Sequence, residues 1–216
     1  GALVRSQDGE THLRYLLPRQ IALDLLGQME RYRRRAALVF DRPRENQVVY
    51  EEIEWHDPRR RPYLLRNRDY IAQVSPIEDA LTEDPIQLMY SGEPAMMHAA
   101  EAALRASSRR DSFSLAVTYY AHMDFAMIDV IYPGCSKGAT LAEWSSRRGY
   151  RREEIMAIGD NFNDVEMLEF AALPVVMANS VSELKNRGWI ETLSNDNAGV
   201  AAAIEAYALR DAVDES

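Results

Sequence analysis

The stretch AIGDNFNDVEML, residues 157–168, places polar side chains directly behind an apolar run. Asn163 and Glu166 have the spacing of a capping box, and Asp164 falls in the first turn of the expected helix, where its charge suits the helix dipole. Neither role accounts for Asp160, which follows a glycine at the end of the apolar run. A carboxylate there needs a partner or solvent, and two converging carboxylates suit Mg²⁺. The stretch predicts a strand-to-helix junction that serves either as a helix cap or as a metal and phosphate site.

Short apolar strands and helices alternate around this junction. A helix is expected over 136–149, with Ser136 as its N-cap and Gly149 as its C-terminal stop. Apolar strands that alternate with helices are typical of a parallel sheet covered on both faces. Ligands of such sheets bind beyond the carboxyl ends of the strands, where Asp160 would lie. The other expected strands are 153–160, 174–178 and 190–194, and the other expected helices are 163–172, 180–188 and 197–212.

Lys137 and Gly138 are locally unfavourable choices for the first turn of a helix. The charge of Lys137 opposes the helix dipole, and Gly138 costs about 1 kcal/mol relative to alanine. Such local inconsistencies are expected at functional sites. An anion at this helix N-terminus would account for both residues, because backbone N–H groups and the ammonium would converge on it. A surface lysine beside a loop glycine is the alternative.

Residues 19–131 have a different pattern from the rest of the chain. Before them, residues 1–18 predict a hairpin with its turn at QDGE, 7–10. Pro18 and the YPG at 132–134 are expected hinges. The insert itself predicts an α+β domain with helices over 18–35 and 93–108 and strands over 36–41, 46–55, 84–92, 112–120 and 124–133.

The composition excludes several classes of protein. The 216 residues include 25 Lys+Arg and 34 Asp+Glu, a net charge of −9, which argues against general nucleic-acid binding. The basic clusters at 31–35 and 57–63 are expected to be solvated surface rather than a phosphate-binding surface. Cys135 is the single cysteine, so no intramolecular disulfide can form, and no apolar stretch is long enough to span a membrane. A cytoplasmic protein that binds neither membrane nor nucleic acid is expected.

Three segments together resemble a known family. YPGCSKGATL (132–141), IMAIGDNFNDVEMLEFAALPVVMANS (155–180) and TLSNDNAGVAAAIE (192–205) resemble the Cof-type subclass, IIB, of haloacid dehalogenase-like (HAD) phosphatases. The hairpin at 1–18 is similar to the one that follows the family's Asn-Gly-Ala, with Gly1 as its glycine. The resemblance implies an α/β fold: a Rossmann-like parallel-sheet HAD core, 1–18 and 132–216, with an inserted α+β cap domain, 19–131.

The resemblance also implies roles for individual residues. Lys137 would bind phosphate and offset the charge on the transferring phosphoryl group. Asp160 of the GDxxND motif would be a ligand of Mg²⁺, and Asp164 would support the metal through water or through a hydrogen bond to one of its ligands. Asn163 would contact phosphate or metal-bound water. The implied activity is Mg²⁺-dependent hydrolysis of a small phosphate monoester, such as a sugar phosphate or another phosphorylated metabolite, through an aspartyl-phosphate intermediate.

One part of the family pattern is missing. The family's nucleophile lies in an Asp-x-Asp-Gly-Thr motif, and this chain contains no Asp-x-Asp. Asp41 follows an apolar run in AALVFDRPRE (36–45), but the residues after it do not match the motif, so Asp41 is not expected to be the nucleophile. We therefore expect the nucleophile segment to lie before residue 1 and this chain alone to be inactive.

Two other readings of the sequence remain. One is a non-catalytic HAD-like module that binds a phosphorylated metabolite or a protein partner. The other is a flavodoxin-like or receiver-like signalling domain, which fits the alternation but accounts neither for the large insert nor for SKG (136–138) before GDNFND (159–164). His56, His98 and His122 show no metal-ligand spacing and are expected to be structural. Residues 66–81 are candidates to line the mouth of the site.

Overall fold

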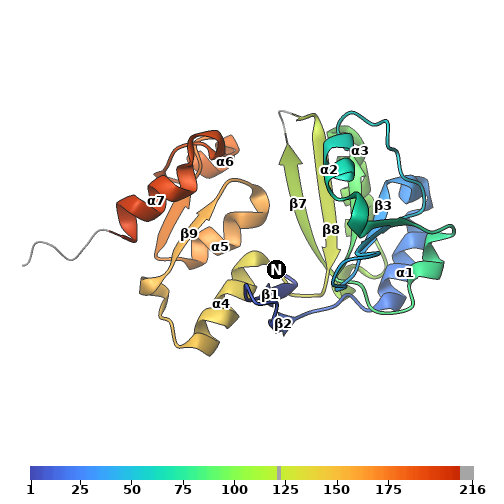
Figure 1. Cartoon of the computed structure of the whole chain (residues 1–216), viewed down its shortest axis with the longest axis horizontal. Helices are drawn as coiled ribbons and strands as arrows, with labels where there is room; N and C mark the ends of the chain where they lie inside the picture. Colours follow the sequence, from blue (N-terminus) through green and yellow to red (C-terminus); the bar gives the residue numbers. More distant parts are fainter. Residues whose placement is uncertain (121–122, 210–216) are drawn as a thin grey trace, which may run out of the picture. The chain divides into compact units, whose positions relative to one another are not determined.

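The computed structural model describes residues 1–120 and 123–209, and the chain forms two compact units (Figure 1). The smaller unit holds Gly1 and the chain from Ser136 onward, and the larger unit holds Ala2–Cys135. Residues 2–18 and 132–135 thus group with the larger unit, whereas the sequence places them with the parallel sheet. Their assignment to a core domain stays a prediction.

The smaller unit has the expected alternation of strands and helices. Strands β9 (Met156–Gly159), β10 (Leu173–Val176) and β11 (Ile190–Glu191) form a parallel sheet in the order β11-β10-β9. The helices are α4 (Lys137–Arg148), α5 (Val165–Phe170), α6 (Ser182–Lys185) and α7 (Gly199–Tyr207). Buried apolar side chains from strands and helices form its core, namely Ala157, Leu168, Ala171, Val176 and Leu184. The parallel sheet predicted from the apolar strands is confirmed.

Both ends of α4 lie where the sequence predicts them. The Ser136 hydroxyl accepts a hydrogen bond from the Ala139 N–H at 3.0 Å, as an N-cap does. Gly149 ends the helix with φ of +76°, a left-handed conformation that glycine adopts without steric cost. These two local signals therefore set the bounds of the helix and make Lys137 its first residue.

The larger unit contains a hairpin and a mixed sheet. The hairpin is β1 (Leu3–Arg5) and β2 (Thr11–Arg14), which are antiparallel as expected. The sheet has the order β5-β4-β3-β6-β8-β7, and only its β4–β5 pair is parallel. Its strands are β3 (Ala36–Val39), β4 (Val48–Tyr50), β5 (Ile71–Gln73), β6 (Gln87–Gly92), β7 (Ser114–Tyr120) and β8 (Phe125–Ile131).

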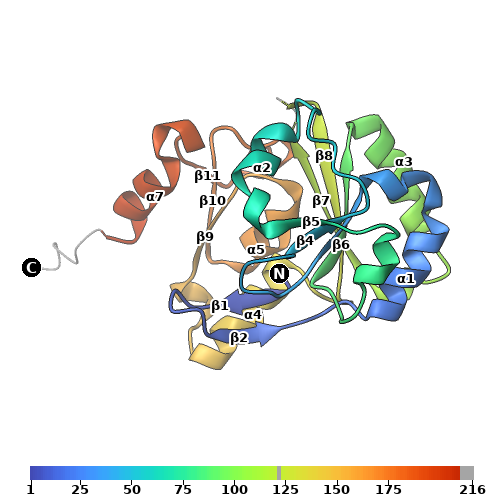
Figure 2. The ribbon, with the colours of Figure 1, turned by 45° about the vertical axis from the view of Figure 1, so that its right-hand side comes forward.

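Helices lie on both faces of this sheet (Figure 2). On one face, α1 (Arg19–Gln28) and α3 (Pro94–Arg105) bury the main core, which includes Leu25, Met97 and Ile128. On the second face, α2 (Arg61–Arg66) buries Leu64 in a smaller apolar cluster with Val48, Tyr50, Ala37 and Met89. The second face is therefore covered by a helix mainly at its β4 side.

The structure departs from the sequence prediction in several elements. In the smaller unit, α6 and β11 are shorter than the helix expected over 180–188 and the strand expected over 190–194. The helix expected over 18–35 ends at Gln28 and continues as a 3₁₀-helix over Glu30–Arg35, and β4 is shorter than the strand expected over 46–55. Helix α2 and strand β5 were not predicted, because both are short and lie in arginine-rich sequence with little apolar periodicity.

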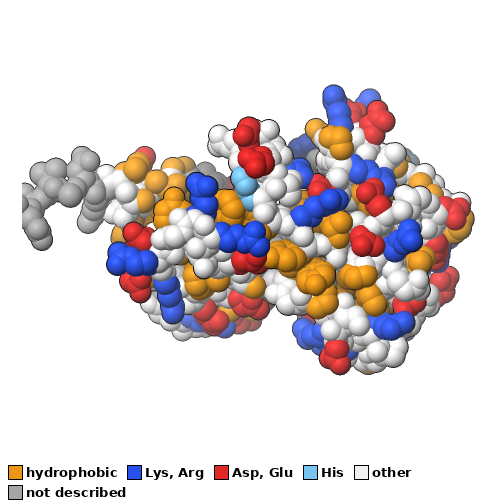
Figure 3. Space-filling model, turned by 90° about the horizontal axis from the view of Figure 1, so that it is seen from below, with side chains coloured by type: hydrophobic (Ala, Val, Ile, Leu, Met, Phe, Trp, Pro, Cys, Tyr) orange, Lys and Arg blue, Asp and Glu red, His pale blue; other side chains and the backbone are white. Residues whose placement is uncertain are grey.

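The basic clusters are built into ion pairs rather than simply solvated. Arg33 bonds to Glu51 and Glu78, and Arg35 bonds to Glu54 at 2.6 Å. Lys and Arg side chains are likewise interspersed with Asp and Glu on the face drawn in Figure 3. Among the residues that the structure describes, no helix has the length and apolar character needed to cross a membrane.

Candidate active site

The predicted site residues come together in the smaller unit. Asp160 follows the last residue of β9, Asn163 and Asp164 lie in the 3₁₀-turn Phe162–Asp164 that leads into α5, and Lys137 is the first residue of α4. The Lys137 ammonium forms a short ion pair with the Asp164 carboxylate. The start of α4 and the β9–α5 junction thus bring a cation and two carboxylates together in the smaller unit.

Asp164 is the organising residue of this group. It is 3% exposed, and its Oδ2 accepts hydrogen bonds from the Asp160 N–H at 2.9 Å and the Asn161 N–H at 3.2 Å. Its Oδ1 accepts from Lys137 Nζ. A buried carboxylate is stable only when it is paired and hydrogen-bonded, and here both oxygens are used. Asp164 therefore orients Lys137 and the backbone of the loop.

Gly159 makes room for this carboxylate. A Cβ atom on Gly159 would lie 2.5 Å from the Cβ of Asp164 and 2.9 Å from its Cγ. Any larger residue would displace the side chain that holds the loop. The glycine before Asp160 is therefore required by the close approach of the Asp164 side chain.

The helix cap differs from the prediction. Asn161, not Asn163, is the N-cap residue of the turn, and its side chain accepts from the Phe162 N–H at 2.9 Å. Asp164 completes the capping box with Asn161, and Glu166 accepts a hydrogen bond from the Ser136 hydroxyl instead. The cap lies two residues earlier than expected because a 3₁₀-turn precedes α5.

Gly138 has a packing role that the sequence did not reveal. A Cβ on Gly138 would lie 2.5 Å from the carbonyl carbon of Glu166 and 2.6 Å from its Cβ. Glycine at this position therefore lets α4 approach the first turn of α5 closely, and no bound anion is needed to account for it. The unfavourable position of Lys137 has a separate cause, because its charge is matched by the buried Asp164.

The electrostatics of Asp160 favour a bound cation. Asp160 is exposed, yet desolvation by the surrounding loop and the neighbouring Asp164 charge raise its pKa, and Lys137 only partly opposes this. A pKa raised in this way means that the surroundings of Asp160 disfavour its charged form. A cation beside Asp160 would stabilise that charged form.

The chemistry of the donor set fits Mg²⁺ in part. Mg²⁺ is commonly held by one or two carboxylates, with water and substrate phosphate as its other ligands. Asp160 fits this role, whereas both oxygens of Asp164 already accept hydrogen bonds. Across residues 1–120 and 123–209, no group of three or more His, Cys, Asp or Glu side chains is placed to hold a metal ion. Asp160 is thus the candidate for a direct ligand, and Asp164 for an indirect one.

The loop after β10 also forms hydrogen bonds to the backbone of the site, which was not predicted from the sequence. The Ser180 hydroxyl donates to the Gly159 carbonyl at 3.4 Å, and the Val181 N–H donates to the Asp160 carbonyl at 3.2 Å. The sequence does contain a signal for this loop. The polar pair Asn179–Ser180 comes after the apolar run of β10, much as Asp160 comes after the apolar run of β9.

The remaining candidates lie elsewhere. Asp41 is in the larger unit, where it pairs with Arg5 and with Arg14, the latter at 2.9 Å, so it has a structural role. His98 stacks on Tyr119 with ring centroids 5.1 Å apart. His122 lies outside the described residues.

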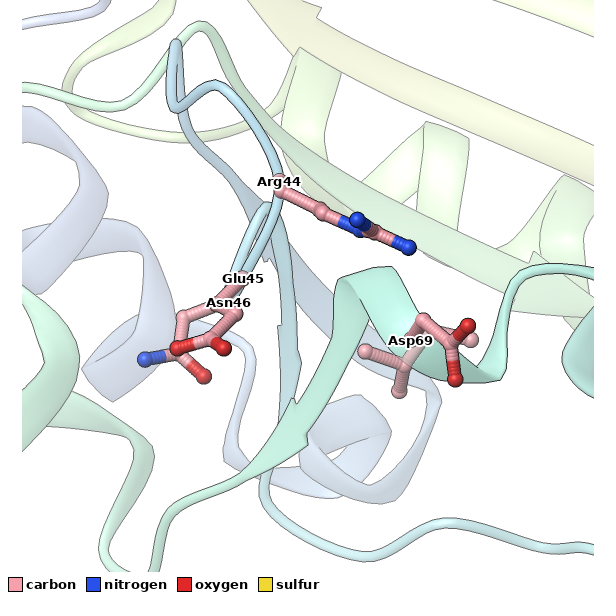
Figure 4. A pocket seen from close by; sticks show the side chains of 5 residues that line it. Arg44, Glu45, Asn46 and Asp69 are labelled. Carbon is pink, nitrogen blue, oxygen red and sulfur yellow. The ribbon is translucent and has the colours of Figure 1, made fainter.

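A pocket in the larger unit is lined by residues of both charges. Arg44, Glu45 and Asn46 come from the β3–β4 loop, and Asp69 and Ile71 come from the segment that leads into β5 (Figure 4). Asp69 and Ile71 belong to the segment 66–81 that is a candidate to line the mouth of the site, whereas Lys137, Asp160, Asn163 and Asp164 do not line this pocket.

The chain is similar to known proteins over most of its length. Residues 1–204 match the haloacid dehalogenase-like hydrolase family. Pyridoxal phosphate phosphatase YbhA of Escherichia coli is 36% identical over 80 residues, which is 37% of this chain and 29% of that protein. The 5-amino-6-(5-phospho-D-ribitylamino)uracil phosphatase YitU of Bacillus subtilis is 38% identical over 81 residues, 38% of this chain and 30% of that protein. The chain spans less than half of the length of curated relatives such as these.

The fold is also found among solved structures. The crystal structure of SMU.1108c from Streptococcus mutans superposes with a TM-score of 0.78 at 21% identity, and the match covers 96% of this chain and 74% of that one. The predicted α/β class with a Rossmann-like parallel sheet is thereby confirmed. The chain is a Cof-type member of the haloacid dehalogenase-like hydrolase family.

Proposed function

We propose that this chain provides the phosphate-binding and metal-binding half of a Mg²⁺-dependent phosphatase that acts on small phosphate monoesters. The observation that carries the proposal is the group at the end of β9, in which the buried Asp164 joins Lys137 to the loop of Asp160. A cation for phosphate and a carboxylate for Mg²⁺, side by side, are the elements that phosphoryl transfer needs.

In this proposal each residue has a separate task. Lys137 holds the phosphoryl oxygens and offsets their charge, and Asn163 contributes a contact to the phosphate. Asp160 binds Mg²⁺, which when present neutralises charge on the phosphoryl group. Asp164 is a positioning residue that keeps Lys137 and the Asp160 backbone in place. Residues 1–18 and 132–216 would form the catalytic core and residues 19–131 the cap.

The nucleophile is the part that these 216 residues do not supply, since no Asp-x-Asp occurs among them. We propose that the reaction proceeds through an aspartyl-phosphate on a residue outside this chain, and that the chain alone is inactive. The same observation favours one other candidate, a module that binds a phosphorylated metabolite or a protein partner without hydrolysing it.

The substrate is proposed to be a small phosphorylated metabolite in the cytoplasm. The E. coli relative is named for pyridoxal phosphate and the B. subtilis relative for a phosphoribityl compound. Both names describe small phosphate esters, and we extend that class, not either compound, to this chain.

Phosphate release from p-nitrophenyl phosphate by the product of the longest reading frame that contains this chain tests the proposal. We expect Mg²⁺-dependent release that falls by more than about 100-fold in both Lys137→Ala and Asp160→Ala. Lys185→Ala is the matched control, because Lys185 pairs with Glu191 on the surface of the same unit. Full activity of both site variants would overturn the assignment, and phosphate binding without release would favour the non-catalytic module.

A further inference from the structure

The pocket of the larger unit carries charges that the proposed function does not use. Its volume is about 410 Å³, within the range of about 300–1,000 Å³ that is usual for small-molecule sites. Four of its five lining residues are polar and exposed, namely Arg44, Glu45, Asn46 and Asp69, and the fifth is Ile71. A ligand can therefore enter from solvent, and the lining favours one that is polar or charged.

The loop that carries Arg44 is held in place by its own contacts. Arg42 pairs with Glu83 at 2.8 Å and donates a hydrogen bond to the Asn46 carbonyl at 3.0 Å. Asn46 has a φ of +57°, in the left-handed region, where asparagine is enriched. The loop therefore presents the Arg44 side chain from a backbone that is already ordered.

The charges in the pocket do not neutralise one another. In the part of the chain that the structure describes, the side chains of Arg44 and Glu45 form no ion pair or hydrogen bond. The Asp69 carboxylate is contacted by the exposed Arg68 at 3.5 Å and not by Arg44. The lining thus holds one guanidinium and two carboxylates, which gives a net charge of −1 at neutral pH.

The two carboxylates lie on different sides of the pocket. Figure 4 shows the Arg44 guanidinium and the Asp69 carboxylate on one side, with Glu45 and Asn46 together on the other. A matching ligand therefore carries a carboxylate and an ammonium close together and a second cationic group further along. Ile71, the first residue of β5, is half-buried and offers apolar surface to the carbon atoms of such a ligand.

We propose that this pocket binds a free basic α-amino acid. Arg44 pairs with the α-carboxylate, Asp69 with the α-ammonium, and Glu45 with the cationic group at the end of the ligand's side chain. The net charge of +1 on such a ligand complements the charge of −1 on the pocket. The ligand contains no phosphate, so this inference goes beyond the proposed function and does not depend on it.

Other ligands match fewer of these groups. A phosphate ester or a dicarboxylate would be repelled by Glu45 and Asp69, and a diamine would leave Arg44 without a partner. The carboxyl end of a peptide lacks the free α-ammonium that Asp69 would bind. Arg44 disfavours a metal ion here, and no group of three or more His, Cys, Asp or Glu among the described residues is placed to hold one.

NMR titration of the full 216-residue chain with L-arginine tests this inference through the backbone amide shifts. We expect the amides of residues 44–47 and 69–72 to shift. Agmatine lacks the carboxylate and Nα-acetyl-L-arginine lacks the α-ammonium, so each should bind about fivefold more weakly than L-arginine, the effect of losing one exposed ion pair. No shift at these residues, or equal binding of agmatine and L-arginine, overturns the inference.

Arg44→Gln removes the proposed partner of the carboxylate, and Arg66→Gln is its matched control. Arg66 is an exposed arginine at the end of α2 that does not line the pocket, so its substitution changes the net charge equally. We expect the affinity for L-arginine to fall about fivefold in Arg44→Gln and to be unchanged in Arg66→Gln. The affinity for agmatine should not fall in Arg44→Gln, because agmatine has no carboxylate. Equal affinity of folded Arg44→Gln and the wild type for L-arginine overturns the inference.

Asp69→Asn tests the contact with the α-ammonium. It should weaken the binding of L-arginine more than that of Nα-acetyl-L-arginine, since only L-arginine carries the group that Asp69 contacts. Equal losses for the two ligands overturn this assignment. An unchanged thermal unfolding midpoint shows that a variant folds, and the comparison of the three ligands on the wild type tests the inference without any variant.

Discussion

Lys137 and Asp164 form an ion pair whose two ends differ in exposure: the carboxylate side chain is 4% exposed and the lysine side chain 42%. The buried partner cannot rearrange, because it also accepts two backbone N–H groups of the loop. The exposed Lys137 can therefore contact a ligand while its ion pair with the buried Asp164 holds it in position.

Asp164→Asn is expected to destabilise the protein by about 1–3 kcal/mol, the usual range when a buried hydrogen-bonding group loses its partner. The amide NH₂ of asparagine would face either Lys137 or the N–H groups of Asp160 and Asn161, all of which are donors. Urea unfolding measures the loss. Glu205→Gln, an exposed change on α7, is the control. A variant as stable as the wild type would show that Asp164 does not hold the loop.

Gly159→Ala is expected to cost about 1–3 kcal/mol, the range for overpacking, because the new methyl group would meet the Asp164 side chain at 2.5 Å. Gly27→Ala is the matched control. Nothing lies within 4 Å of a Cβ built on Gly27, which is in α1, and alanine there is expected to stabilise the helix by up to about 1 kcal/mol. Thermal unfolding of both variants distinguishes them, and equal midpoints would contradict the expected clash.

Mg²⁺ is expected to raise the thermal unfolding midpoint of the wild type but not that of Asp160→Asn, since an ion that binds only the folded state stabilises it. Without Mg²⁺, Asp160→Asn should be at least as stable as the wild type, because it removes the repulsion between Asp160 and Asp164. Ca²⁺ and Na⁺ at equal ionic strength serve as controls for screening. A normal response to Mg²⁺ in the variant would remove Asp160 from the proposed metal site.

Low pH is expected to destabilise the larger unit, because it protonates the two carboxylates that are hydrogen-bonded to Arg33. Hydrogen bonds from Arg33 hold the pKa values of Glu51 and Glu78 below their usual range. A folded-state pKa below the unfolded value, roughly 4.3, gives stability that is fully present above that value and is lost as the pH falls through the folded pKa.

The double variant Glu51→Gln, Glu78→Gln tests this dependence. The double variant should be less stable than the wild type at pH 7. The difference between their free energies of unfolding should become smaller as the pH falls from 5 to 3. The free energy of urea unfolding at several pH values measures it, with the exposed Glu45→Gln as control. A difference in the free energy of unfolding that stays constant over this range would show that protonation of the two carboxylates is not coupled to folding.

The parts of the fold that could be predicted are those with local signals. Ser136 and Gly149 bound α4 through capping geometry alone, and the apolar runs of β9 and β10 indicated a parallel sheet without reference to distant residues. The contact between Lys137 and Asp164 does not follow from the parallel sheet in this way, because the strand before α4 is β8 of the six-stranded sheet. It depends instead on the packing of α4 against α5.

The parts that could not be predicted depend on contacts through space. Two asparagines, Asn161 and Asn163, compete for one cap, and a 3₁₀-turn decides between them. The reason for Gly138 is the backbone of Glu166 on another helix. The hydrogen bond from Gln87 of β6 to Asp129 of β8 joins residues that are diagonal across two strands, so it forms only once the strand register is set.

Three consecutive residues at the start of α4 are fastened to the start of α5: Ser136 to Glu166, Lys137 to Asp164, and Gly138 to the backbone of Glu166. The lysine and the acidic loop therefore form one preorganised element. A ligand that contacts both the lysine and the loop does not have to order these groups on binding. Little of its interaction energy is then lost to conformational entropy, and most of it contributes to the affinity. Substitutions that disturb the contacts between the starts of α4 and α5 should therefore weaken the binding of every phosphorylated ligand to a similar extent, whatever its organic part.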